Sequence, residues 1–207
     1  MLEDNKSYLK DLNEAQLNAV LKTDGPSMVI AGAGSGKTRV LTYKIVHLVE
    51  NGVDPFEILA LTFTNKAARE MKLRISSMIG ESESKNIWMG TFHSVFAKIL
   101  RFEAHKIGFT SDFTIYDTQD SERLISSIIK EKALDKDVYR AKSIRNRIST
   151  LKNNFITVNG YFANIELVES DNLSRKPETG NIYKEYSERL IKSNSMDFDD
   201  LLMKTNE

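Results

Sequence analysis

The sequence predicts an α/β protein in which a parallel sheet, with its helices, carries an inserted and mostly helical region. Three apolar runs of strand length are each followed by a pattern typical of a helix: 27–30, 58–63 and 86–91. Because strands that alternate with helices usually pair in parallel, the carboxyl ends of these strands should meet at one edge of a sheet. From Gly108 onward such apolar runs become scarce and helical patterns dominate.

The change of pattern near residue 108 predicts a domain boundary. Residues 1–107 and 194–207 are expected to form the α/β domain, and residues 108–193 the helical insertion. Within the insertion, three segments have helical periodicity: 117–132, 137–151 and 182–192. The polar stretch that contains Asn159-Gly160 and Lys176-Pro177 is expected to be irregular.

Composition narrows the class of protein. The chain of 207 residues is long enough to bury a core, and its 29 basic and 29 acidic residues neither favour nor exclude a nucleic-acid partner. The absence of cysteine excludes disulfides and thiolate metal sites and fits a reducing cytoplasm. No apolar run has membrane length, so no membrane partner is expected. The N-terminus is acidic and lacks an apolar centre, unlike a signal peptide.

The first predicted element is a helix from Leu12 to Leu21. Asn13 is placed to cap its N-terminus, and the turn at 24–26 should end it and lead into the first strand. The side-chain amide of Gln16 has the donor and the acceptor that an adenine base requires. Taken alone, this residue is more simply interpreted as an exposed surface glutamine.

A glycine-rich turn follows the first strand and leads into a helix that should end near Glu50. The stretch Ala31-Gly-Ala-Gly-Ser-Gly-Lys-Thr38 lets the backbone approach a ligand closely. Its successive N–H groups can bind phosphate oxygens at the helix N-terminus. Lys37 would reach the terminal phosphates, and Thr38 would offer its hydroxyl to Mg²⁺. The strict pattern has glycine where Ala31 stands, and a plain glycine turn beside an exposed lysine is the alternative.

The second strand is a continuous apolar run, as expected for a strand that is covered on both faces. Thr64 and Asn65 can then cap a helix that extends from Lys66 to about Ile79. That helix has a single acid, Glu70, and four basic residues: Lys66, Arg69, Lys72 and Arg74. Basic residues beside a strand end suit a phosphate backbone, and a solvated helix face is the alternative.

The third strand follows a polar loop at 81–85 and leads into a helix at 92–101. Four polar or aromatic residues lie at this junction: Thr91, Phe92, His93 and Ser94. All three strand ends therefore carry small or polar residues, which should line one edge of the sheet. Taken alone, His93 is more often a hydrogen-bonded structural histidine than a catalyst, and no other histidine is spaced to share a metal with it.

Two clusters of charge in the remaining sequence have open interpretations. Five basic residues occur without an intervening acid: Arg140, Lys142, Arg145, Arg147 and Lys152. They would contact phosphates or form an ordinary charged helix face, and the sequence favours neither. The acids Asp197, Asp199 and Asp200 suggest a metal site. An N-cap at Ser195 or Asp197, with acids in the first turn of a helix, is the better interpretation.

Together these motifs resemble the N-terminal part of superfamily 1A helicases, the UvrD, Rep and PcrA group. Leu12-Asn-x-x-Gln16 resembles the Q motif, and Ala31 to Arg39 resembles helicase motif I, whose first position is often alanine in that family. Residues 61–71 resemble motif Ia and residues 90–94 resemble motif Ib. Residues 196–201 resemble the segment where subdomain 1B returns to domain 1A. The resemblance covers essentially the whole chain in the family's order.

The resemblance implies a P-loop, RecA-like parallel sheet, incomplete in this chain, with subdomain 1B as the helical insertion. It implies ATP and Mg²⁺ as ligands, with Lys37 and Thr38 serving catalysis and Thr38 holding the metal. The residues that would bind the nucleotide are Gln16, Ala31, Gly32, Ala33, Gly34, Ser35, Gly36, Lys37, Thr38 and Arg39. Single-stranded DNA and junctions with duplex would be bound by Phe63, Thr64, Asn65, Lys66, Phe92 and His93.

In the family, the next motif is an apolar strand that ends in Asp-Glu, and no such strand follows Met203. The second motor domain of the full-length protein lies further on. Because hydrolysis needs groups from both, the resemblance implies an ATP-driven helicase, 3′ to 5′ in direction, of which this chain is a fragment inactive in hydrolysis. Without its neighbouring strands, the fragment should expose apolar sheet surface or an unpaired strand edge, and it should self-associate.

Three other functions fit parts of the sequence. A nucleic-acid-binding module with an idle nucleotide site would bind DNA without ATP. The helicase subunit of a helicase–nuclease complex shares the same motifs. A small P-loop kinase would need a catalytic carboxylate and a lid, and the resemblance to motif Ia argues against it.

Overall fold

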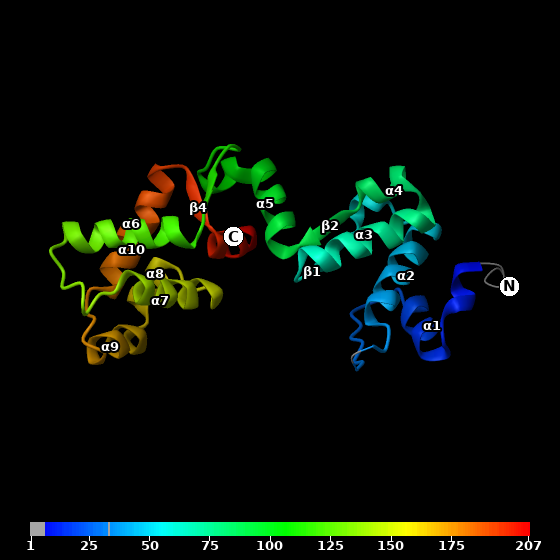
Figure 1. The fold of residues 1–207 in the computed structure, drawn as a ribbon, viewed down its shortest axis with the longest axis horizontal. Coiled ribbons are helices and arrows are strands. Elements are labelled where there is room, and N and C mark those ends of the chain that lie inside the picture. The colour runs from blue at the N-terminus through cyan, green and yellow to red at the C-terminus, as the bar shows by residue number, and fades with distance from the viewer. Residues whose placement is uncertain (1–6, 33) are drawn as a thin grey trace. The chain divides into compact units, whose positions relative to one another are not determined.

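The computed structural model describes residues 7–32 and 34–207 and divides the chain into two compact units, Met1–Val95 and Phe96–Glu207. Each unit combines helices with a short parallel sheet, which confirms the predicted α/β class (Figure 1). The division follows Val95, earlier than the predicted boundary near residue 108, and residues 194–207 pack within the second unit. Their assignment to the same domain as residues 1–107 stays a proposal.

The described elements of unit 1 alternate helices with two short strands. They are η1 (Ser7–Asp11), α1 (Glu14–Leu21), α2 (Lys37–Glu50), η2 (Pro55–Glu57), β1 (Leu59–Thr62), α3 (Asn65–Ile79), α4 (Glu81–Asn86), β2 (Trp88–Thr91) and the first residues of α5 (Phe92–Glu103).

Helix α1 begins with a capping box. The Asn13 side chain accepts a hydrogen bond from the Gln16 backbone N–H at 2.9 Å, and the Gln16 side chain accepts one from the Asn13 backbone N–H at 3.2 Å. These bonds satisfy donors that a helix start otherwise leaves unpaired, so Asn13 is confirmed as the N-cap. Lys44 of α2 donates to the backbone oxygens of Ala19 and Lys22, which holds α2 against the end of α1.

Strands β1 and β2 lie parallel, and their register pairs Leu59 with Trp88 and Thr62 with Thr91. Helix α3 makes the connection between them that two parallel strands require. Its buried residues Met71 and Ile75 share one apolar cluster with residues of or beside the strands: Ile58, Ala60 and Ile87. Ile45 of α2 belongs to the same cluster, so both helices are fixed to this sheet.

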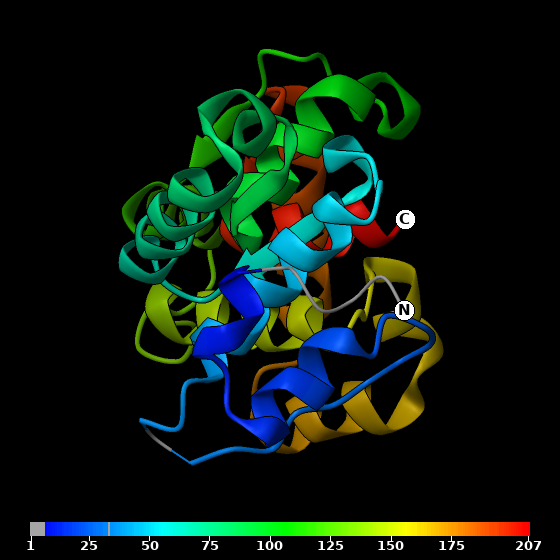
Figure 2. The ribbon, with the colours of Figure 1, turned by 90° about the vertical axis from the view of Figure 1, so that its right-hand side faces the viewer.

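The strand predicted at 27–30 does not form, and that prediction is wrong. Residues 22–32 make an irregular loop (Figure 2), and Met28 and Ile30 are 83% and 86% exposed. Backbone groups in a strand need a neighbouring strand to bond with, and within the described residues β1 pairs only with β2. The apolar run therefore lacks a partner. These exposed apolar side chains belong to a loop and not to a sheet, so exposed sheet surface and self-association both stay predictions.

Residues 81–85, predicted as a polar loop, form most of helix α4. Glu81 and Glu83 in its first turn suit the positive end of the helix dipole. The Ser84 hydroxyl lies 2.7 Å from the hydroxyl of Ser76 on α3, which fastens the short helix to its neighbour. This polar stretch therefore forms a short helix, and a polar contact between Ser84 and Ser76 joins it to α3.

Unit 2 contains the predicted helices together with short elements that the sequence did not predict. In order, after α5, its described elements are η3 (Ala104–Ile107), β3 (Thr114–Tyr116), α6 (Thr118–Glu131), α7 (Ala141–Asn153), α8 (Val158–Ala163), α9 (Ile165–Leu173), α10 (Thr179–Lys192), β4 (Ser195–Asp197) and α11 (Phe198–Asn206).

Helices α8 and α9 occupy the stretch that was predicted to be irregular. The side chains of Thr157 and Asn164 cap them, at 3.1 Å from the Gly160 N–H and 3.3 Å from the Leu167 N–H. Asn159-Gly160 consequently lies inside a helix, where its turn-like composition is overridden by capping and packing. None of the helices in the described chain is both long enough and apolar enough to cross a membrane.

Strands β3 and β4 bring together two segments that are distant in sequence. They lie parallel, with Thr114 beside Ser195 and Tyr116 beside Asp197. Asn194 precedes β4 with a φ of 46°, a left-handed conformation that asparagine tolerates. Its backbone oxygen accepts from the Thr114 N–H at 3.0 Å. The helical segment between the strands therefore leaves the pair after Tyr116 and returns to its other end at Asn194, one short strand length away.

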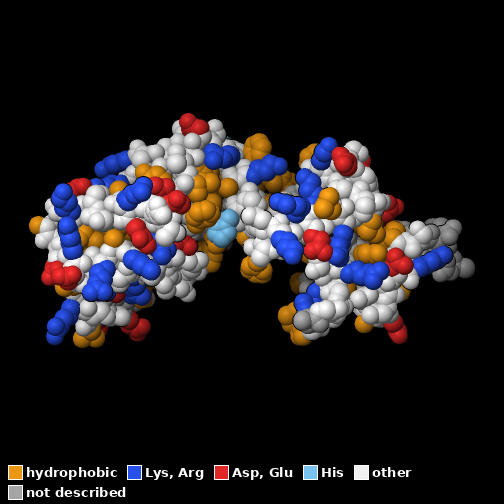
Figure 3. Space-filling view, viewed as in Figure 1, with side chains coloured by type: hydrophobic (Ala, Val, Ile, Leu, Met, Phe, Trp, Pro, Cys, Tyr) orange, Lys and Arg blue, Asp and Glu red, His pale blue; other side chains and the backbone are white. Residues whose placement is uncertain are grey.

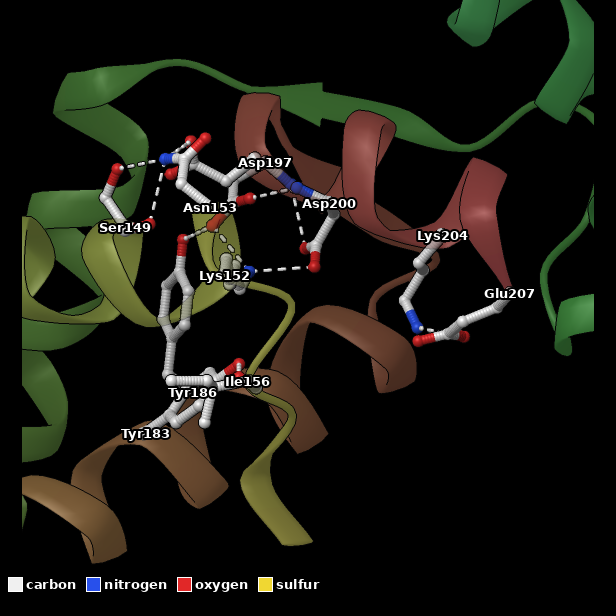
Figure 4. Close-up of polar contacts among 11 residues, drawn as sticks. Ser149, Lys152, Asn153, Ile156, Tyr183, Tyr186, Asp197, Asp200, Lys204 and Glu207 are labelled. Atoms are coloured by element: carbon white, nitrogen blue, oxygen red, sulfur yellow. Dashed lines mark hydrogen bonds and ion pairs between the residues drawn. The ribbon is translucent and has the colours of Figure 1, made fainter. Parts of the chain in front are cut away.

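A buried lysine connects α7 with the segment that follows α10. The Lys152 side chain is 1% exposed, and its ammonium lies 2.8 Å from both Asp197 and Asp200 (Figure 4). The Tyr186 hydroxyl of α10 donates to Asp197 at 2.8 Å. Asp197 also caps α11, with Asp200 completing the capping box. The N-cap interpretation of this acidic segment is therefore confirmed, and the cap is Asp197 rather than Ser195.

The buried charges change one another's pKa. Burial alone would lower the pKa of Lys152, but attraction to Asp200 and Asp197 outweighs burial and raises it. For Asp197, burial opposes ionisation, yet the attraction of Lys152 holds the pKa below its usual value. Burial raises the pKa of Asp200, and repulsion from Asp197 adds to the increase. Lys152 is therefore charged at neutral pH and lies at the same distance from both carboxylates.

Replacing Lys152 by methionine should strongly destabilise unit 2. The substitution leaves Asp197 and Asp200 buried together without a cation, which typically costs about 3–5 kcal/mol of unfolding free energy. Urea unfolding followed by circular dichroism measures the change. Lys142→Met removes an exposed lysine from the same helix and serves as the control. Equal stability of the two variants would contradict the inferred role of Lys152.

Candidate functional site

The loop between residues 31 and 37 ends at a helix N-terminus without a side-chain cap. Gly36 is the N-cap of α2, has a φ of 89° and provides no side-chain hydrogen bond. A φ in this range favours glycine over other residues. The N–H groups of the first turn of α2 therefore remain available to an external acceptor, because a helix start leaves its first donors unpaired.

Lys37 bends back over this loop. Its ammonium donates to the backbone oxygen of Ala31 at 2.8 Å and to that of Gly32 at 2.6 Å. The Ser35 hydroxyl donates to the same oxygen of Gly32 at 2.7 Å. A cation and unpaired N–H groups thus gather at one exposed loop, and this donor set fits a phosphate anion. Thr38 lies exposed in the first turn of α2, directly after Lys37.

Gln16 joins α1 to the same loop. Its side-chain nitrogen donates to the Ser35 backbone oxygen at 3.1 Å. A Cβ atom at Gly36 would lie 2.7 Å from that nitrogen, so the close approach of Gln16 depends on glycine there. The structure therefore brings together the predicted residues Gln16, Gly32, Ser35 and Lys37. Gly34 also lies in the loop, with a φ of 77°, whereas the predicted Ala33 lies outside the described residues.

Two of the three predicted junctions share an edge of the sheet. Because Thr62 pairs with Thr91, the residues after both strands emerge at the same end. The rings of Phe63 and Phe92 lie 5.5 Å apart between centroids, and Phe63 is 90% exposed. Thr64 caps α3, its hydroxyl accepting from the Ala67 N–H at 3.2 Å. The third junction, the loop at 31–37, does not join this edge, because no strand precedes it.

Gly90 and Ser94 shape the second of these junctions, and Gly90 was predicted only as part of the stretch that resembles motif Ib. A Cβ atom at Gly90 would lie 2.6 Å from the Ser94 hydroxyl oxygen and 2.9 Å from Val95. The Thr91 hydroxyl accepts from the Ser94 N–H at 3.3 Å and so starts α5. Glycine thus permits the sharp change from strand to helix that presents Phe92 and His93. In the sequence, a small residue one position before a capping threonine is the signal from which this role of Gly90 could have been predicted.

The basic residues of α3 remain largely unpaired. Arg74 pairs with Glu70 at 2.5 Å, whereas no ion pair of Lys66, Arg69 or Lys72 is found within the described residues. Lys and Arg side chains gather over α3 in Figure 3. Asn65 and Lys66 form its first turn, directly after Thr64. A positive helix therefore begins at the aromatic edge of the sheet.

The basic run on α7 is different, because most of its charges are neutralised inside unit 2. Arg145 pairs with Glu122 at 3.2 Å, Arg147 with Asp171 at 3.1 Å, and Lys152 with Asp197 and Asp200. These three residues are unavailable as a continuous phosphate-binding surface. Within the described residues, no group of three or more histidines and acids is arranged to hold a metal ion.

Comparisons with known proteins agree on one family. A model described as the UvrD/REP helicase N-terminal domain matches residues 12–207. The ATP-dependent DNA helicase PcrA of Bacillus subtilis is 43% identical over 95% of this chain, and that of Leuconostoc citreum is 42% identical over 94%. PcrA of Staphylococcus aureus is 41% identical over 96%. The matched region is 25–26% of each relative, so the chain spans about a quarter of their length.

Gly90→Ala should destabilise unit 1 by about 1–3 kcal/mol, because the added methyl overpacks the first turn of α5. Trp88, the only tryptophan of the chain, lies two residues away in β2 and reports the unfolding of this unit by fluorescence. Gly32→Ala is the matched control, since no atom lies within 4 Å of a Cβ built there. A loss of stability as large in Gly32→Ala would remove the explanation by close packing.

Proposed function

The chain belongs to the UvrD/REP helicase family, and we propose that it is the ATP-binding and single-stranded-DNA-binding N-terminal part of an ATP-dependent DNA helicase. The observation that carries the proposal is the loop of Lys37 at the uncapped N-terminus of α2. The aromatic edge at Phe63 and Phe92, within the same unit, supports the second half of the proposal.

The loop supports a nucleotide site in which each residue has a separate role. Backbone N–H groups of residues 34–38 would bind phosphate oxygens, and the Lys37 ammonium would exchange its bonds to Ala31 and Gly32 for bonds to phosphate. Thr38 would offer its hydroxyl to Mg²⁺, which when bound neutralises charge on the β- and γ-phosphates. Gln16 would contact the adenine, and Arg39 would lie along the base.

The edge of the β1–β2 sheet supports a site for a single strand of DNA. An exposed aromatic ring lets bases stack without regard to sequence, which suits Phe63, with the half-buried ring of Phe92 beside it. Thr64, Asn65 and His93 would contact the backbone, aided by the N-terminus of α3. Lys66 and its neighbours on α3 add positive charge beside that path. The nucleic-acid partners would be single strands and their junctions with duplex.

In the whole protein, binding of ATP between this part and a second motor domain would close the two and move the strand, in the 3′ to 5′ direction. The 207 residues by themselves would bind nucleotide weakly and hydrolyse it negligibly. Phosphoryl transfer needs carboxylates and arginines that this proposal assigns to other parts of the protein.

A nucleic-acid-binding module with an idle nucleotide site is the second candidate. The bonds from Lys37 to Ala31 and Gly32 favour it, because they already satisfy the ammonium without phosphate. Such a module would bind DNA at low salt and leave ATP unbound. A helicase subunit of a helicase–nuclease complex would share all the features described here, and it is a variant of the first proposal.

Lys37→Ala should weaken ATP binding by about tenfold to a hundredfold, since a hydrogen bond to a charged group contributes about 1.5–3 kcal/mol. Equilibrium titration of a fluorescent ATP analogue with Mg²⁺ measures the change. Lys72→Ala removes an exposed lysine from α3 and should leave ATP binding unchanged. DNA binding without any ATP binding would favour the idle-site module. ATP turnover that disappears in Lys37→Ala would refute the proposed inactivity of the chain.

Phe63→Ala should weaken binding of single-stranded DNA about tenfold, because stacking of one base on an aromatic ring contributes about 1–3 kcal/mol. Fluorescence anisotropy of a labelled oligonucleotide at low salt measures this. Phe56→Ala is the matched control: Phe56 is 62% exposed in the same unit but belongs to η2, which precedes β1 and so lies away from the carboxyl ends of the strands. If both variants bind DNA as the unmodified protein does, the aromatic edge is not the DNA site.

A further inference from the structure

We propose that Asp11 and Tyr43 are positioning residues that hold the Arg39 guanidinium for the base of a bound nucleotide. The inference rests on the proposed function, because it takes the loop at 31–38 as the phosphate site. It assigns a purpose to η1, the short helical turn that precedes α1.

A cavity of about 460 Å³ lies beside the first two turns of α2. Six of its lining residues are Tyr8, Asp11, Arg39, Tyr43 and, from α3, Arg74 and Met78. Arg39 is three residues beyond Gly36, so the cavity begins within one helical turn of the loop. Its lining combines aromatic rings with guanidinium groups, which are the side chains that stack on planar heterocycles.

The Arg39 side chain is held from two directions. Its guanidinium lies over the Tyr43 ring, 5.4 Å from the centroid, and 3.8 Å from the Asp11 carboxylate. The Tyr43 hydroxyl donates to the same carboxylate at 3.5 Å. The ring lies on one side of the guanidinium, while 42% of the Arg39 side chain stays exposed. A planar group of a ligand can therefore stack on the open face.

Tyr8 anchors the turn that supplies Asp11. Its hydroxyl lies 3.2 Å from Nδ1 of His47, which is buried on α2, and its ring lies 6.5 Å from that of Tyr43. Both contacts fix η1 to the same helix that bears Arg39. Asp11, at the end of this turn, thus reaches Arg39 from a fixed position rather than from a free chain end.

A role toward the base can be separated from a general structural role by the choice of ligand. Inorganic tripolyphosphate has the phosphates of ATP but no base. Loss of a residue that positions Arg39 should weaken ATP binding and leave tripolyphosphate binding unchanged. Loss of a residue that merely stabilises the loop or α2 should weaken both equally.

The experiment titrates the whole 207-residue chain with ATP and with tripolyphosphate, each with Mg²⁺, by calorimetry at low salt. We expect the unmodified protein to bind ATP more tightly. Asp11→Asn should weaken ATP binding about two- to fivefold, and less at high salt because the ion pair is exposed. Tyr43→Leu should weaken it by a similar factor. Tyr43→Phe keeps the ring and should retain most of the affinity. Tripolyphosphate binding should stay the same throughout.

Asp24→Asn is the matched control, since it makes the same chemical change at an exposed acid of unit 1 for which the described chain shows no ion pair. Circular dichroism checks that each variant is folded. Unchanged ATP binding in both Asp11→Asn and Tyr43→Leu overturns the inference, as does an equal loss for both ligands. Equal binding of ATP and tripolyphosphate by the unmodified protein overturns it too, while the phosphate loop stands. Binding of neither ligand rejects the proposed function and this inference with it.

Discussion

The parallel pairing of β1 with β2 is the constraint on which the arrangement of unit 1 depends. Because Thr62 lies opposite Thr91, whatever follows each strand must appear at the same end of the sheet. The contact between Phe63 and Phe92 is a direct result of that register. Slipping one strand by a single residue would turn its side chains to the opposite face, and the Phe63 and Phe92 rings would no longer meet.

Much of this arrangement follows from local sequence. The parts that do not follow from it share one physical reason. The caps at Asn13, Thr64 and Asp197 were predictable because each needs only residues a few positions away. The strand expected at 27–30 fails because pairing depends on a neighbour elsewhere in the chain. The arrangement of Tyr8, Asp11 and Tyr43 around Arg39 could likewise not be predicted from the sequence, because it joins η1 to α2 across some 30 residues.

Charge patterns proved informative only together with burial. On α3, whose single acid Glu70 pairs with Arg74, the remaining lysines and arginine keep their charge at the surface. On α7, an equally basic stretch lies against acids of α6, α9 and α11, so most of its charged side chains form ion pairs inside unit 2. A run of basic residues in the sequence thus predicts binding of an anionic ligand only where the fold places no acidic side chains beside that run. Lys152 is the extreme case, since burial makes its pairing with Asp197 obligatory.

The return of the helical segment to the strand pair has an evolutionary consequence. Exposed connections between helices are the places where a chain best tolerates insertions and deletions. The connections between Tyr116 and Ser195 can therefore vary in length, whereas the helices that bear Lys152 and Tyr186 are held by their contacts with Asp197. Related proteins are thus free to diversify those connections, with the buried pair of Lys152 and Asp197 as the fixed point.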